Sequence, residues 1–203
     1  LQIDLALVRQ RLVESPWVAE VALRRVLPAT IEVFISERRP IGLCRLGQKL
    51  YLVDETGVVI DEFGPHYAEF DLPIVDGLVG VPPRRGAPPA EIDPRRAELA
   101  SRVIAALGRS QEIGARLSQV DVTDPHDAVV LLDGDTALLH LGTDKFLPRV
   151  QSYLELSSTL RERVAEIDYV DLRFDERVYV RPTGTQRRSG TAARTTAPVN
   201  RQF

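Results

Sequence analysis

The chain has 203 residues, of which 44% are hydrophobic and 27% are charged, an ordinary globular composition that allows one large core or two small ones. Its net charge of −3 is unevenly distributed, because residues 182–203 hold four arginines and no acidic residue, which leaves about −7 on the rest. A mildly acidic body does not attract phosphates broadly, and arginines scattered among Thr, Ala and Gly form no basic groove. The composition therefore argues against nucleic acid as a partner.

The sequence is expected to be a fragment of a longer protein, because residue 1 is Leu and the sequence contains no Met. The longest apolar runs, such as Ala128 to Leu132, fall far short of the roughly 18 residues that a membrane-spanning helix needs. We therefore expect a membrane anchor or export signal to lie upstream of Leu1. Cys44 is the only cysteine, so no internal disulfide can form and cysteine usage does not decide the redox compartment.

The first 40 residues have the pattern of a helix followed by a β-hairpin. Asp4 can cap a helix that extends to about Glu14, because apolar residues recur between them at helical spacing. Apolar and polar residues then alternate over residues 18–25 and 31–36, on either side of a turn at Pro28. This pattern predicts a half-buried hairpin packed by the first helix.

From residue 41 onward the pattern changes to short strands separated by turns, with two longer helical segments. Strands are expected over residues 41–46, 50–53, 58–60, 72–75, 117–122, 128–132, 137–141, 169–174 and 178–180, and helices over 94–107 and 146–163. The Pro-rich residues 82–89 are expected to form a surface connection. The fold class is therefore α+β, in which a helix and hairpin precede a β-rich domain of antiparallel strands with two helices.

We place the domain boundaries at 1–40, 41–182 and 183–203. The last segment contains too few apolar residues to offset the entropy lost on ordering, so we expect it to be a disordered tail.

Candidate catalytic and metal-binding residues do not form a recognisable site. The three histidines His66, His126 and His140 stand in a loop, a turn and a strand, whereas metal ligands usually come in groups at short spacing. Cys44 lies within an expected strand, where free cysteine usually serves as a small buried hydrophobe, and no nearby base would activate it. We therefore expect no catalytic residue, no metal and no cofactor.

Five aspartates form the densest group of carboxylates: Asp121, Asp124, Asp127, Asp133 and Asp135. A calcium site or an acid/base pair is one interpretation, but the spacing lacks the Gly and the closing Glu of a calcium loop. Aspartates commonly accept hydrogen bonds from backbone amides in turns. We therefore interpret the group as turn residues.

An ordered set of residues carries a family resemblance. The set is Ser15, Pro16, Trp17 and Val18, then Arg24, Arg25, Leu27, Pro28, Thr30, Ile31 and Val33, and finally Glu37, Arg38, Arg39 and Pro40. It resembles the end of a POTRA domain of the FtsQ/DivIB family, with a Pro-Trp-Val step, an Arg-x-x-Pro-x-Thr turn and a strand ending in Glu-Arg-x-Pro. A POTRA domain normally starts with a strand and a helix that would precede Asp4, so the first domain is expected to be partial.

The resemblance continues to about residue 181. Residues 51–58 and 72–77 look like the start of the second, β-rich domain of the family, and residues 169–180 resemble its terminal strands. Trp17, at the junction of the first helix and strand, is expected to fill a small core.

The family resemblance implies a division scaffold without catalytic activity. Members of the FtsQ/DivIB family link early and late division proteins and bind FtsB (DivIC) and FtsL outside the cytoplasm. The resemblance therefore implies a single-pass inner-membrane protein at the division septum, with this part in the periplasm or extracytoplasmic space.

The expected partner site is the exposed edge of the last strand, where an extended partner segment would add a strand. Its residues are Arg173, Phe174, Arg177, Val178, Tyr179 and Val180. Phe174 and Tyr179 are the expected affinity anchors, since buried aromatics are frequent hot spots. The alternative is that both aromatics close the core and that Arg173 forms a salt bridge within the fold.

Two other functions compete with this interpretation. One is a POTRA-bearing binding module of outer-membrane assembly or secretion, which would usually carry several POTRA repeats and a barrel. The other is a hydrolase that uses the aspartates or Cys44.

Overall fold

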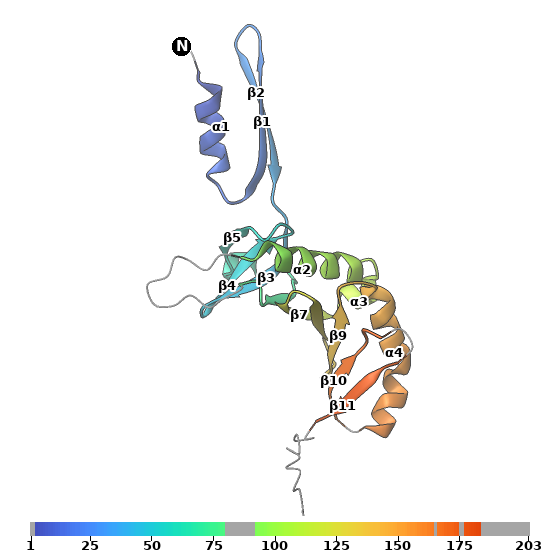
Figure 1. Ribbon diagram of the computed structural model, residues 1–203. Helices are drawn as coiled ribbons and strands as arrows, with labels where there is room; N and C mark the ends of the chain where they lie inside the picture. The colour runs from blue at the N-terminus through green and yellow to red at the C-terminus, as the bar shows by residue number, and fades with distance from the viewer. Residues whose placement is uncertain (1–2, 80–91, 165, 175–176, 184–203) are drawn as a thin grey trace, which may run out of the picture.

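The computed structural model describes residues 3–79, 92–164, 166–174 and 177–183, which form two separate sheets. Helix α1 (Leu5–Val13) and the two-stranded sheet of β1 (Val18–Val26) and β2 (Thr30–Glu37) project from one end of a nine-stranded sheet (Figure 1). The large sheet contains β3 (Pro40–Leu46), β4 (Lys49–Asp54), β5 (Val59–Glu62), β6 (Ile74–Asp76), β7 (Leu117–Asp124), β8 (Asp127–Leu132), β9 (Leu138–Gly142), β10 (Ile167–Asp171) and β11 (Tyr179–Pro182). The helices of this second unit are η1 (Pro65–Tyr67), α2 (Pro94–Leu107), α3 (Gln111–Gly114) and α4 (Phe146–Arg163).

The predicted α+β class is confirmed, but the large sheet is mixed rather than wholly antiparallel. Its strand order is β11-β10-β9-β8-β7-β6-β3-β4-β5, and β3 with β6, β6 with β7, and β9 with β10 run parallel. Helix α2 lies between β6 and β7 in the sequence, and α4 lies between β9 and β10. A helical crossover returns the chain to the same end of the sheet, so the strands that it joins become parallel. The short α3 was not expected either.

One row of apolar side chains crosses seven strands on the face that the helices cover. Following the strand registers, the row is Cys44, Val75, Val120, Val130, Leu139, Val170 and Val180. All are buried except Val180, which is half-buried against the same core. Helix α2 packs on β7 and β8, and α4 packs on β9. The row fixes which face of each strand points inward, because a slip of one residue would turn every apolar side chain outward.

The two long helices begin and end as their sequences predict. Asp93 caps α2 by accepting a hydrogen bond from the Arg95 amide at 2.9 Å, and Pro94 occupies the first turn, where its missing N–H costs nothing. Helix α4 buries Phe146, Val150 and Tyr153. Within the described residues, no helix is both long and apolar enough to cross a membrane.

The N-terminal unit has less buried surface than predicted. Asp4 caps α1 as expected, through the Ala6 amide at 2.9 Å, and α1 packs on β1. On β2, however, Val33 and Ile35 remain about half exposed, and Phe34 on the opposite face is 55% exposed. The alternating pattern of β2 therefore predicted the strand but not its burial, because α1 covers β1.

Trp17 and Arg38 both connect the N-terminal unit to the large sheet. The Trp17 ring packs 5.7 Å from the Tyr67 ring, against the small cluster of Leu43, Leu52 and Ile60, so it fills a core as predicted. Arg38, just after β2, pairs with the carboxylate of Asp54 at 2.6 Å. Asp54 is only 5% exposed.

Both oxygens of the Asp54 carboxylate accept hydrogen bonds at this junction between the two units, which we call the joint. The oxygen that does not bind Arg38 accepts hydrogen bonds from the Thr56 amide, the Thr56 hydroxyl and the Val58 amide, at 2.8 to 2.9 Å. Burial alone would raise the pKa of Asp54, but the hydrogen bonds from Thr56, Arg38 and Val58 outweigh it and hold that pKa below its usual value. The carboxylate therefore stabilises the turn and the joint in its charged form.

Two predicted features lie outside the described residues: most of the tail and the Pro-rich segment at 82–89. The boundary between residues 40 and 41 stays a prediction.

Asp54→Ala should lower the free energy of unfolding by about 3 kcal/mol, because it leaves a partly buried Arg38 and two backbone amides without their acceptor. Urea unfolding monitored by Trp17 fluorescence measures this change and reports on the joint. Glu55→Ala, at the exposed neighbouring position, is the control and should change stability by less than about 0.5 kcal/mol. Equal effects of the two substitutions would show that Asp54 does not hold the joint.

Candidate functional site

The last described strand, β11, forms one edge of the nine-stranded sheet and pairs with β10 on its inner side only. Val178 and Val180 are half-buried against the core, whereas Arg177, Tyr179 and Arg181 are exposed. This alternation follows the side-chain period of a strand. The outer backbone groups of β11 therefore have no partner strand within the described part of the chain.

Phe174 and Tyr179 form an aromatic pair at this edge. Phe174 is 53% exposed and Tyr179 is 50% exposed, so neither is a buried core residue. Their ring centroids lie 5.3 Å apart with the rings tilted at 75°, an edge-to-face contact. The two rings together form an exposed aromatic surface beside β11.

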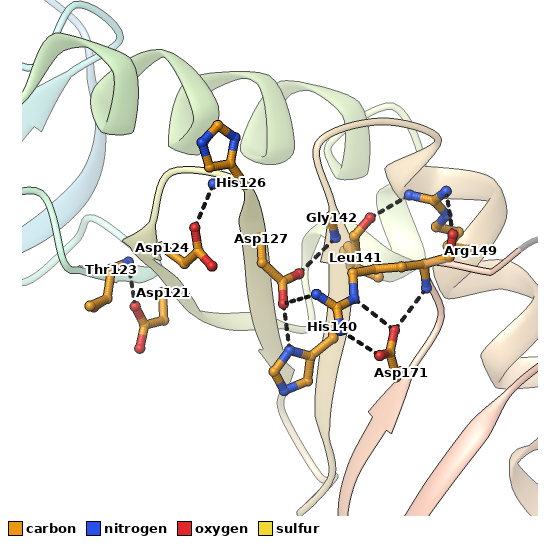
Figure 2. A network of polar contacts seen from close by, with 11 residues as sticks. Asp121, Thr123, Asp124, His126, Asp127, His140, Leu141, Gly142, Arg149 and Asp171 are labelled. Atoms are coloured by element: carbon orange, nitrogen blue, oxygen red, sulfur yellow. Dashed lines mark hydrogen bonds and ion pairs between the residues drawn. The ribbon is translucent and has the colours of Figure 1, made fainter.

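Arg173, the third predicted residue of this segment, bonds within the fold. Its guanidinium donates to both carboxylate oxygens of Asp171, at 2.9 and 2.6 Å, and lies 3.1 Å from a carboxylate oxygen of Asp127 on β8 (Figure 2). The Arg173 amide also donates to Asp171 at 3.1 Å. The salt-bridge alternative for Arg173 is therefore correct, and a direct contact with a partner would have to use the exposed part of its side chain.

The same contacts explain why β10 ends earlier than predicted. The expected strand extended to Phe174, but β10 ends at Asp171. The Asp171 side chain accepts a hydrogen bond from the backbone two residues later, which turns the chain out of the ladder. Phe174 consequently lies on the connection to β11 instead of in the strand.

Further contacts complete a polar network of Asp127, His140, Arg149, Asp171 and Arg173, which we call the Arg173 network. Asp127 accepts a hydrogen bond from the Gly142 amide at 2.9 Å and lies 2.7 Å from the His140 ring. Arg149 on α4 donates to the Arg173 carbonyl at 3.1 Å. The network thus draws on β8, β9, β10 and α4 (Figure 2).

Gly142 is the backbone position that allows this convergence. Its φ of +68° lies in the left-handed region, and a Cβ atom there would come within 3.3 Å of the Arg173 side chain and 3.4 Å of the Arg149 side chain. Sequence reasoning missed Asp127, His140 and Arg149 as members of one network, because they are scattered along the sequence and each has an ordinary individual role. The glycine that closes β9 was the only available signal.

Three of the other aspartates accept backbone amides, as the turn interpretation predicts. Asp121 and Asp124 accept hydrogen bonds from the amides two residues later, at 2.7 and 2.8 Å. Asp135 binds the Ala137 amide and also the Tyr153 hydroxyl and Arg161. No group of residues suited to a metal ion occurs among the described residues.

Cys44 is also a structural residue. It is 1% exposed, and burial raises the pKa of its thiol to about 11, so the nucleophilic thiolate is scarce at neutral pH.

Asp171→Asn should reduce the acid sensitivity of folding. Hydrogen bonds from Arg173, together with its charge, lower the pKa of Asp171 against the opposing effect of burial. A carboxylate with a lowered folded pKa contributes stability that is present above its ordinary pKa of 3.8 and is lost as pH falls below it. The variant should therefore be less stable at neutral pH and lose less stability from about pH 5 to about pH 3.

Chemical unfolding at several pH values measures this slope. Asp168→Asn is the control on the same strand, because its carboxylate is exposed and its ion pair with Arg181 is long, at 3.7 Å. A variant slope equal to that of the parent would contradict the assigned role of Asp171.

Comparison with known proteins identifies both units. Residues 1–38 match the model of the FtsQ-type POTRA domain, and residues 43–173 match the model of the C-terminal part of cell division protein FtsQ/DivIB. The extracytoplasmic domain of the trans isomer of DivIB from Geobacillus stearothermophilus is 14% identical, with a TM-score of 0.38 over 64% of this chain and 98% of that one.

Curated relatives named cell division protein FtsQ match nearly the whole chain. The protein from Koribacter versatilis is 30% identical over 94% of this chain, and that from Geobacter sp. is 25% identical over 89%. The chain spans 53% and 65% of the lengths of these two proteins. Since the C-terminal family model alone covers well over half of the sequence, the chain belongs to the FtsQ/DivIB family of cell division proteins.

Proposed function

We propose that this chain is the extracytoplasmic part of a division scaffold that binds an extended segment of an FtsB- or FtsL-type partner along the outer side of β11. The partner would link it to other division proteins, and an inner-membrane anchor would place it at the septum. No chemical reaction is part of this function. The observation that carries the proposal is the position of β11 at the edge of the described sheet, beside the exposed Phe174–Tyr179 pair.

The two edges of the large sheet differ in a way that favours β11. At the opposite edge, β5 ends in the exposed acidic residues Asp61 and Glu62, whereas β11 ends in the exposed Arg181 and Pro182, so both edges hold residues that discourage indiscriminate pairing. At the β11 edge, the inward Val178 and Val180 anchor the strand to the core while Tyr179 faces outward. A partner strand would gain backbone hydrogen bonds and an aromatic contact there.

The charges of β11 also favour a different protein over a second copy of this chain. In an antiparallel self-pairing centred on Tyr179, Arg177 of one copy would lie opposite Arg181 of the other. Like charges directly opposite each other destabilise strand pairs. A partner strand without this basic pattern avoids the repulsion.

The family matches support a division role over the competing functions. The N-terminal match is to the FtsQ type of POTRA domain, which disfavours a role in outer-membrane assembly or secretion. The hydrolase interpretation is disfavoured because Cys44 is buried and the aspartates serve turns and ion pairs.

Phe174→Asp and Tyr179→Asp should each weaken binding of the extracytoplasmic segment of the FtsB homologue from the same organism about 30-fold, as the loss of an aromatic hot spot does. Calorimetric titration measures the affinity, and circular dichroism checks the fold of each variant. Phe34→Asp is the matched control, since Phe34 is similarly exposed, at 55%, but lies on β2. Unchanged affinity in both edge variants, or an equal loss in the control, would contradict binding at β11.

A further inference from the structure

We infer that Asp127 is a positioning residue that holds Phe174 against Tyr179 and so prepares the β11 edge for its partner. This inference rests on the proposed function. Asp127 does not belong to the edge itself: it lies at the start of β8, is 6% exposed, and is separated from β11 by β9 and β10.

Between Asp171 and Phe174 the described chain is held by the buried Leu172 side chain and by the bonds of Arg173. Beyond Asp171 the chain leaves the ladder, and the Leu172 amide, which donates to the His140 carbonyl at 3.0 Å, is the last bond to β9 that precedes Arg173. Arg173 is therefore the residue through which the connection is held next to Phe174. The Asp171 carboxylate binds Arg173 from the end of β10, which is a local contact between residues two positions apart.

Asp127 adds a restraint from β8, two strands away from β10. Its carboxylate lies 3.1 Å from the Arg173 guanidinium, and the Gly142 amide and the His140 ring hold the same carboxylate at 2.9 and 2.7 Å (Figure 2). An almost fully buried carboxylate needs such partners, because losing its cationic partner would leave an uncompensated buried charge and lower stability. Arg149 restrains the Arg173 carbonyl from the opposite side, at 3.1 Å.

The consequence for recognition is pre-organisation. An exposed aromatic on an unrestrained connection would sample many orientations, and a partner would have to order it on binding. With Arg173 fixed by Asp127, the next residue is presented with its ring 5.3 Å from the Tyr179 ring. Asp127 thus acts on the partner through Arg173 and Phe174, without touching it.

Asp127→Asn tests the inference, because it keeps the volume and an acceptor for the Gly142 amide but removes the charge that faces Arg173. Asp121→Asn is the matched control on β7, where the carboxylate accepts the Thr123 amide at 2.7 Å. The first measurement needs no partner: the nuclear Overhauser effect between the Phe174 and Tyr179 rings in the free chain. We expect it in the parent and in the control, and we expect it to be weak or absent in Asp127→Asn.

The second measurement is a double-mutant cycle of Asp127→Asn with Phe174→Ala in titrations with the same FtsB segment. Asp127→Asn should weaken binding by roughly 2- to 30-fold. In the Asp127→Asn background, Phe174→Ala should then weaken binding by a smaller factor than it does in the parent. Merely structural destabilisation would leave the effect of Phe174→Ala unchanged. If Asp127→Asn unfolds, Asp127→Ser, which keeps a hydroxyl acceptor, takes its place.

Each outcome decides the inference. An undiminished ring contact in Asp127→Asn overturns it, and so does unchanged affinity despite a lost contact. If the parent does not bind the FtsB segment, the proposed function fails, while the ring contact still decides whether Asp127 positions Phe174.

Discussion

The row of apolar side chains from Cys44 to Val180 is the constraint on which the rest of the structure depends. It links seven strands in one register under α2 and α4. In each of these strands, burial of the side chain in the row determines which face points toward the helices. Because Val180 is the last member of this row, β11 is held firmly on its inner side and on its helix-facing side. Its outer edge pairs with no other described strand and carries the exposed Tyr179, which is the surface that the proposed partner strand would use.

Two ion pairs with buried carboxylates hold chain segments that the apolar row does not include. Asp54 binds Arg38 across the joint between the two units, and Asp127 binds Arg173 across the strands that precede β11. Both carboxylates are almost fully buried and both receive backbone amides as well as an arginine. Each therefore ties together segments far apart in the sequence, and each fixes the direction of a chain that has just left a sheet.

Most of the fold could be predicted from the sequence, because strands and helices depend on local periodicity. The caps at Asp4 and Asp93 and the span of α4 follow from such signals. The parallel pairings and the exposure of β2 could not be predicted, since they depend on which segments meet in space. At the proposed site, Phe174 and Tyr179 were predicted through the family resemblance, whereas the proposed role of Asp127 depends on a contact between residues 46 positions apart that no local pattern encodes.

Strand addition at β11 is the central claim, and amide hydrogen exchange in the presence and absence of the FtsB segment tests it most directly. The claim predicts new protection of the outward-facing backbone amides of residues 179–181 and none within the opposite edge strand, Val59–Glu62. Protection confined to the N-terminal unit or to the helices, with β11 exchanging as in the free chain, would contradict it.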